Sequence, residues 1–374
     1  MRYCNKCVTP ETQEGVIFGD DGICQTCKNI EIKKHDIDWV ARRKLLDKLV
    51  SQYAGTGTYD CIVPFSGGKD STYQLYFVVR ELGLKPLVVR YDHWGFRPHV
   101  EENNKRTFQI LGCDVLQLSV SWHTVKELMR KGIELRGDFC WHCHTGVYGY
   151  VMQLAVKLGI PLLLWGEAPW EYSSAQNPEQ IMELEAKYFC NFIGLGLSGE
   201  EILAREKSGK LTERDIRPFL FPSREELAQA GVRGIFLGNY IPWETRRHVE
   251  IIKKELGWKG VLVEGVPPAW DYEKIECKWQ GVRDWSKFIK RGFGRTNHLA
   301  SIDIRKGIMA REQGLELVRQ YDGKRPASLD IFLKEINITE EQFLEWMLRH
   351  QVAPWSFAEH KYETGPTLPD MDSW

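Results

Sequence analysis

The stretch YDCIVPFSGGKDS at residues 59–71 decides the fold of this chain. Ile62 to Phe65 are apolar and favour β-structure, which predicts a short buried strand. The next six residues turn the chain, and apolar residues at helical spacing follow from Thr72 to Leu82. The stretch therefore predicts a strand, a loop and a helix in direct succession.

The loop between this strand and this helix has the composition of an anion site. It consists of Ser66, Gly67, Gly68, Lys69, Asp70 and Ser71. Paired glycines let the backbone approach a ligand closely, and the N–H groups that open a helix suit an anion. Lys69 adds a positive charge for phosphate, and Asp70 is placed to help hold a metal. The chain has no Gly-x-x-x-x-Gly-Lys-Ser/Thr segment, so this is not a Walker loop.

Strand and helix patterns alternate on both sides of this loop. The further strands are expected at 86–91, 115–120, 162–165 and 234–237, and the helices at 36–53, 100–111, 124–135, 146–158, 245–256 and 340–349. Such alternation predicts an α/β fold with a mainly parallel, doubly wound sheet. We expect four regions: a zinc ribbon (1–30), a helical linker (31–57), the α/β domain (58–260) and a mostly helical C-terminal region (261–374) that binds substrate.

Composition favours a cytoplasmic protein without membrane insertion. Charged residues make up 27% of the 374 residues and nearly balance, with a net charge of −1. This balance argues against a dedicated nucleic-acid binder. The N-terminus has no apolar signal core, and no apolar run approaches the ~20 residues of a membrane span.

Four of the ten cysteines form two Cys-x-x-Cys pairs near the N-terminus, Cys4 with Cys7 and Cys24 with Cys27. Pairs at this distance can deliver four thiolates to one tetrahedral zinc ion. A segment of about thirty residues buries too little apolar surface to fold alone, so a bound metal is expected to stabilise it. Four protein ligands leave no open coordination position, which predicts a structural zinc.

Further polar residues fall where the predicted strands end. Asp92 and His93 follow the second strand, and Glu167 follows the fourth, where an acid can hold Mg²⁺ or meet a substrate. Arg291 and Arg295 belong to the basic segment KRGFGR and can bind a substrate phosphate, although a solvated basic face explains them equally well.

A second unusual cluster, CWHCH at residues 140–144, is expected just before the helix of 146–158 and near the same crevice. Its cysteines and histidines can ligate a metal, position a substrate or cap a helix.

These segments resemble known enzymes. SGGKDS resembles the loop of ATP pyrophosphatases of the PP-loop type, which cleave ATP to AMP and pyrophosphate while adenylating a carbonyl oxygen. Together with the ribbon, DHWGF (92–96), FCWHCHTG (139–146), WGE (165–167) and KRGFGR (290–295), the chain resembles the N-acetyl sugar amidotransferases. These act in bacterial lipopolysaccharide O-antigen and flagellar glycan synthesis.

The resemblance implies conversion of a sugar acetamido group to an acetamidino group, with ATP, Mg²⁺ and structural Zn²⁺ as cofactors. It implies catalysis by Lys69, Asp70 and Glu167, and ATP binding by the 66–71 loop with Asp92 and His93. The acceptor, expected to be a nucleotide-linked sugar, would meet Trp141, His142, His144, Arg291 and Arg295.

The nitrogen would come from elsewhere. No Gly-x-Cys-x-Gly glutaminase elbow is present in the sequence. The resemblance implies a separate glutaminase subunit and a cyclase-like companion that supply ammonia.

Two alternatives remain at this stage. A tRNA 2-thiolation enzyme would use Cys140 and Cys143, with Cys190 or Cys277 as a third ligand, for an iron–sulfur cluster. A non-enzymatic nucleotide-binding scaffold is the other, and ATP turnover would distinguish it from both enzymes.

Overall fold

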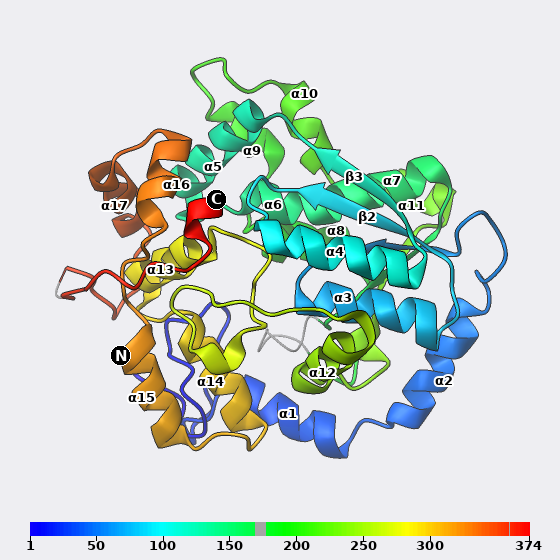
Figure 1. Ribbon diagram of the computed structural model, residues 1–374, viewed down its shortest axis with the longest axis horizontal. Coiled ribbons are helices and arrows are strands. Elements are labelled where there is room, and N and C mark those ends of the chain that lie inside the picture. Colours follow the sequence, from blue (N-terminus) through cyan, green and yellow to red (C-terminus); the bar gives the residue numbers. More distant parts are fainter. Residues whose placement is uncertain (169–176, 359) are drawn as a thin grey trace.

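A parallel β-sheet lies at the centre of the computed structural model, which describes residues 1–168, 177–358 and 360–374 (Figure 1). Within that part of the chain the sheet has five strands: β1 (Cys61–Pro64), β2 (Pro86–Asp92), β3 (Asp114–Ser119), β4 (Leu162–Trp165) and β5 (Arg233–Phe236). All neighbouring strands pair in parallel. The predicted α/β class and its mainly parallel sheet are confirmed.

Helices connect and surround the strands. They are α1 (Gln25–His35), α2 (Trp39–Val50), α3 (Lys69–Tyr76), α4 (Pro98–Leu111), α5 (Trp122–Arg136), α6 (Trp141–Thr145), α7 (Val151–Leu158), α8 (Ala186–Tyr188), α9 (Gly199–Ala204), α10 (Glu213–Ile216), α11 (Arg224–Ala230), α12 (Thr245–Leu256), α13 (Gln280–Arg291), α14 (Arg295–Arg305), α15 (Arg311–Tyr321), α16 (Leu329–Ile336) and α17 (Glu340–Leu348). Single π-helical turns extend α3 over Phe77–Glu81 and join α6 to α7 over Gly146–Tyr150.

The strand order β3-β2-β1-β4-β5 creates a switch point beside β1. The chain runs outward from β1 through β2 to β3, then returns to the other side of β1 to add β4 and β5. In open parallel sheets ligands bind at such a point, outside the carboxyl ends of the strands. Here those ends are followed by the 66–71 loop after β1 and by Glu167 after β4.

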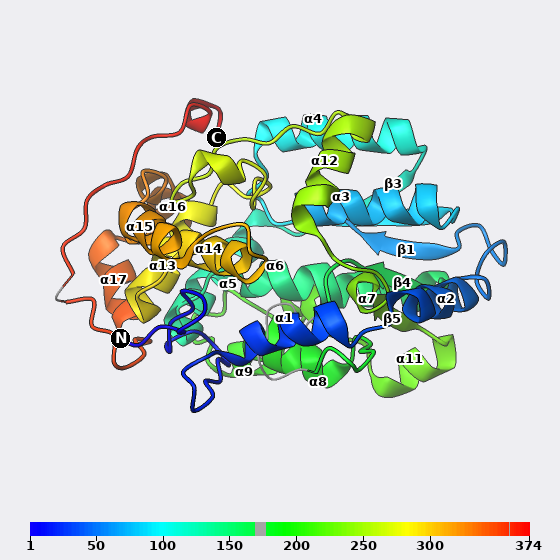
Figure 2. The ribbon, with the colours of Figure 1, turned by 90° about the horizontal axis from the view of Figure 1, so that it is seen from below.

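Helices cover both faces of the sheet, as the apolar strands require. Alternate residues of β4 separate the two faces: Leu162 and Leu164 pack with the core around α3, α4 and α12, whereas Leu163 and Trp165 pack with α7. Figure 2 shows the strands between α3 and α7. This burial on both sides holds the carboxyl ends of β1 and β4 in fixed positions.

The N-terminal segment packs against the C-terminal helices (Figures 1 and 2). Asn297 of α14 donates to the carbonyl of Val8 at 2.7 Å, and Arg305 donates to the Thr9 hydroxyl at 2.7 Å. Arg311 donates to the carbonyls of Cys4 and Cys7. The first and last parts of the chain therefore form one packed unit.

Two helices differ most from the sequence prediction. The helix expected from residue 146 starts at Trp141, so the CWHCH cluster lies within its first turns instead of before it. α1 has no counterpart among the expected helices, because its apolar residues do not follow a helical period; it begins at Gln25, between the last two ribbon cysteines.

No helix in the described ranges is both long and apolar enough to cross a membrane.

Candidate active site

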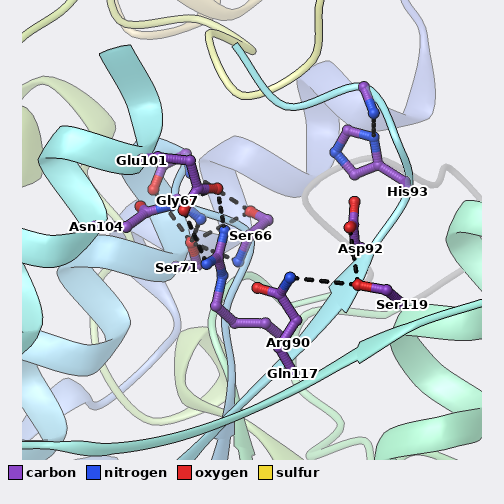
Figure 3. Close-up of polar contacts among 12 residues, drawn as sticks. Ser66, Gly67, Ser71, Arg90, Asp92, His93, Glu101, Asn104, Gln117 and Ser119 are labelled. Carbon is purple, nitrogen blue, oxygen red and sulfur yellow. Dashed lines mark hydrogen bonds and ion pairs between the residues drawn. The ribbon is translucent and has the colours of Figure 1, made fainter. Parts of the chain in front are cut away.

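The 66–71 loop is closed by its own hydroxyl groups. Ser71 Oγ accepts hydrogen bonds from the backbone N–H groups of Ser66 and Gly67 at 3.2 and 3.1 Å. Gly67 has a φ of 88°, a conformation that glycine adopts without strain, and a Cβ there would lie 2.4 Å from Asn104 Oδ1. Figure 3 shows these residues gathered beside Asn104. The serines and the glycine thus build a tight turn that opens directly into α3.

Lys69, the first residue of α3, is the charged centre of the site. Its Nζ lies 2.7 Å from Asp70 Oδ2 and 2.8 Å from Glu273 Oε2, and its side chain is 7% exposed. Burial alone would lower the pKa of Lys69, but Asp70, Glu273 and Glu167 outweigh it and raise that pKa well above its ordinary value. Lys69 is therefore a permanent cation at the carboxyl end of β1.

Glu273 comes from the C-terminal region, just before α13. Burial would raise its pKa, but Lys69 and then Arg295 act against burial and lower the pKa of Glu273 to about 2. It stays ionised at neutral pH. Distant parts of the chain thus meet at Lys69, and sequence spacing gives no sign that residue 273 contacts residue 69.

Two cavities meet at Lys69. The smaller, of about 200 Å³, lies over the 66–71 loop and is also lined by residues that follow β4. The larger, of about 480 Å³, lies between this loop, the N-terminal segment and α13 and α14. Lys69, Glu167, Tyr188 and Lys274 line both cavities. We call them the loop cavity and the outer cavity.

Most of the predicted loop residues line the loop cavity, whereas two of the five predicted acceptor residues line the outer one. The loop cavity is lined by Ser66, Gly68, Lys69, Asp70, Ser71 and Glu167. The outer cavity is lined by His144 and Arg295. Burial, and to a lesser extent the positive charge of Arg283, lower the pKa of His144 to about 3. Its ring is therefore neutral at pH 7.

Asp92 and His93 line neither of these two cavities. Asp92 accepts a hydrogen bond from the Trp94 N–H at 2.8 Å. It accepts a second from the Ser119 hydroxyl at 2.9 Å (Figure 3). His93 is buried, and its Nδ1 accepts from the Gly95 N–H at 3.1 Å. Both side chains stabilise the turn after β2, and their expected contact with ATP stays a prediction.

Trp141, His142 and Arg291 also lie outside the outer cavity. Trp141 is 2% exposed and donates its indole N–H to the Leu197 carbonyl, because the helix begins early enough to turn it into the core. His142 is buried with its Nδ1 3.2 Å from the Tyr91 hydroxyl. The Nε of Arg291 lies 2.6 Å from Glu14 and joins α13 to the N-terminal segment. These three side chains have partners in the packed protein, and their expected contact with the acceptor stays a prediction.

The loop cavity holds a carboxylate that lacks a partner. Glu276 Oε2 is buried, and among the described residues it has no hydrogen-bond partner. A Cβ on Gly68 would lie 2.7 Å from this oxygen, so a larger residue there would displace the Glu276 carboxylate. Asp70 and Glu167 line the same cavity. Mg²⁺ keeps several waters and takes one or two carboxylates, so this donor set fits the ion.

The four N-terminal cysteines fit zinc. All are buried, and their sulfur atoms lie within 4.8 Å of one another. Two of the sulfur pairs, Cys4 with Cys27 and Cys7 with Cys24, are each 3.9 Å apart. A tetrahedral ion with Zn–S bonds of about 2.3 Å needs roughly 3.8 Å between sulfurs. The donor set and its spacing thus match a closed structural zinc site.

Cys140, Cys143 and Cys277 do not form a comparable group. Among the described residues, the four N-terminal cysteines are the one set of three or more Cys, His, Asp or Glu ligand atoms within metal-binding distance. This arrangement gives no support to the iron–sulfur cluster that a thiolation enzyme would need.

Two comparisons with known proteins found similarities to this chain. Residues 270–368 match a family model described as the C-terminal domain of WbpG-like LPS biosynthesis proteins. An uncharacterized protein of Methanocaldococcus jannaschii is 23% identical over 184 residues, which cover 48% of this chain and 65% of that relative. The match therefore spans less than two thirds of the relative. The C-terminal region that supplies Glu273 is similar to a lipopolysaccharide-biosynthesis domain.

Proposed function

We propose that this chain is the synthase subunit of an ATP-dependent amidotransferase that converts an acetamido group of a bacterial surface-glycan sugar to an acetamidino group. One observation carries the proposal: Lys69 lines both cavities, so a phosphate on the loop and a second substrate would meet at one charge. The sheet with its SGGKDS loop would be of the PP-loop ATP pyrophosphatase type.

In this proposal the loop cavity takes the phosphates of ATP. The N–H groups at the start of α3 and the Lys69 ammonium would interact with the negative charge of the phosphates. The phosphates would replace Glu273 as the ion-pair partner of Lys69. One or two of the carboxylates of Asp70, Glu167 and Glu276, together with water, would hold Mg²⁺, which neutralises charge on transferring phosphates. These residues thereby favour cleavage between the α- and β-phosphates.

The outer cavity takes the sugar. His144, which is neutral, offers a hydrogen bond to an amide or hydroxyl group, and Arg295 offers a charged contact at the wall. A nucleotide-linked sugar is an anion, and Arg283 and Lys287 of α13 line the same cavity. The similarity of residues 270–368 to an LPS-biosynthesis domain supports a surface-glycan acceptor.

The chemistry requires activation of a poor leaving group. The amide oxygen attacks the α-phosphorus and pyrophosphate leaves; ammonia then adds to the activated carbon, and AMP leaves with the C–O electron pair. Water must be excluded, because hydrolysis would restore the amide. A separate glutaminase and a cyclase-like companion would supply the ammonia.

We expect the purified chain to form AMP, pyrophosphate and an amidine in equal amounts. The test combines ATP, Mg²⁺, an ammonium salt and a panel of diacetamido sugars, free and nucleotide-linked. Mass spectrometry should show a product lighter by about 1 Da, the change when NH replaces oxygen. Reactions without sugar or without ammonium are the controls. ADP as the main nucleotide product would contradict the proposal.

We also expect ammonium salts to support this reaction without a partner, whereas glutamine alone does not. The sequence has no glutaminase nucleophile elbow. Initial rates of amidine formation with equal concentrations of ammonium and glutamine provide the measurement. Equal rates with the two nitrogen sources would show that the chain is more than a synthase subunit.

A further inference from the structure

Lys274 occupies the junction of the two cavities. It lines the loop cavity and the outer cavity, and Lys69 is the other cation that does so. Lys69 is engaged by Asp70 and Glu273. Among the residues that the structure describes, the Lys274 ammonium has no hydrogen-bond or ion-pair partner. It is therefore the cation at this junction that remains available to a ligand.

The backbone holds Lys274 in an unusual conformation. Its φ is 50°, in the left-handed region that residues with a side chain rarely adopt. Its neighbours are fixed, because Ile275 is buried in the core and Glu273 is paired with Lys69. Strained residues of this kind persist where the surrounding structure determines them, and they concentrate at functional sites. The strain and the absent partner are independent observations on one residue.

We propose that Lys274 is a catalytic residue that contacts the α-phosphate of the nucleotide and of the adenylated acceptor. This inference rests on the proposed function. The α-phosphorus is the atom that passes from the nucleotide to the second substrate, so it must lie where the two cavities meet. Lys69 would bind the β- and γ-phosphates, and Lys274 would bind the α-phosphate, which is transferred to the acceptor.

Lys274 would act in both halves of the reaction. In the first, the bond between the amide oxygen and the α-phosphorus forms, the bond to the β-phosphate oxygen breaks, and pyrophosphate leaves with that electron pair. In the second, a C–N bond forms, the C–O bond breaks, AMP leaves with its electron pair, and the added nitrogen loses one proton to solvent. A fixed ammonium beside the α-phosphate stabilises the charge on it in each step. Lys274 exchanges no proton in either.

The test measures binding of AMP and adenosine to the full-length protein by isothermal titration calorimetry. Lys274→Met should weaken AMP binding roughly 10- to 10²-fold, the effect of losing one charge-assisted contact, and leave adenosine binding unchanged. Lys69→Met should weaken ATP binding more than AMP binding. Lys278→Met is the matched control, since Lys278 lies in the same segment but lines neither cavity. It should bind AMP like the wild type.

Lys274→Gly keeps the test independent of folding, because glycine adopts the left-handed conformation freely. It should lose AMP affinity as Lys274→Met does. With ATP, Mg²⁺, ammonium and a nucleotide-linked diacetamido sugar, both variants should show kcat lower by about 10²-fold, and Lys274→Arg should recover part of it. Equal AMP affinity in the wild type and Lys274→Met would overturn this inference alone. A wild type that binds no AMP would overturn the proposed nucleotide site and the inference together.

Discussion

Replacing Lys69 by methionine is expected to lower the rate of AMP formation by at least about 10²-fold, as when a group that stabilises transition-state charge is removed. Methionine keeps much of the side-chain volume, so the change removes the charge rather than the packing. The measurement is AMP release from ATP in the presence of acceptor and ammonium. Lys278→Met, in which a partly buried lysine away from both cavities is changed, should retain the wild-type rate.

Lys69→Met should also lower the stability of the protein, and the size of this loss should decrease at low pH. Burial opposes ionisation of Glu273, but Lys69 and Arg295 lower its pKa from 4.5 to about 2. A group with a lowered pKa stabilises the fold above its unfolded pKa, and this stabilisation disappears as the pH falls through the folded pKa. The difference in melting temperature between the wild type and the variant should therefore be full above pH 4.5 and narrow as the pH falls toward 2. A difference that is constant over this range would contradict the role given to the Lys69–Glu273 pair.

The sheet could be predicted because its determinants are local. Buried parallel strands are apolar throughout, and β1, β2, β4 and β5 lie within one or two residues of their predicted positions. The loop at 66–71 is recognisable for the same reason, since a glycine pair followed by a lysine, between a strand and a helix, is typical of a turn that binds phosphate. The strand order, and with it the switch point, was not predicted, because it depends on which strands pair in space.

The acceptor residues were harder to predict because they depend on contacts between distant segments. Trp141 and His142 belong to a cluster rich in potential ligands, yet the helix that begins at Trp141 turns both into the core. Glu273 and Lys274 lie in a stretch without a recognisable pattern, and they reach the site only because the C-terminal helices pack against the sheet domain. Neither periodicity nor spacing contains that information.

Disrupting the proposed zinc site at Cys4, Cys7, Cys24 and Cys27 is the second change for which we expect a large effect. A Cys4→Ser/Cys7→Ser variant should lose its bound zinc, and the N-terminal segment should unfold with it. Zinc binding supplies roughly 10–16 kcal/mol of apparent free energy to sites of this type at pH 7, far more than so short a segment gains from apolar burial. Elemental analysis gives the zinc content, and limited proteolysis reports on the segment.

The consequence should extend to the outer cavity. Gln13, Glu14 and Gly15 line it, and Arg291 and Arg305 tie the segment to α13 and α14. Loss of the segment should therefore raise the KM for the sugar acceptor. AMP binding in the loop cavity should stay within about threefold of the wild type, because among the described residues no hydrogen bond or ion pair joins residues 66–71 to residues 1–30. Cys113→Ser/Cys190→Ser, in which two cysteines outside the ribbon are changed, is the matched control and should keep its zinc. If the double variant precipitates, a chelator applied to the wild-type protein, with zinc added back, provides the same comparison.

Zinc content unchanged in the Cys4→Ser/Cys7→Ser protein would refute the assignment of these thiolates as zinc ligands. An unchanged acceptor KM after zinc loss would show that the N-terminal segment does not shape the outer cavity.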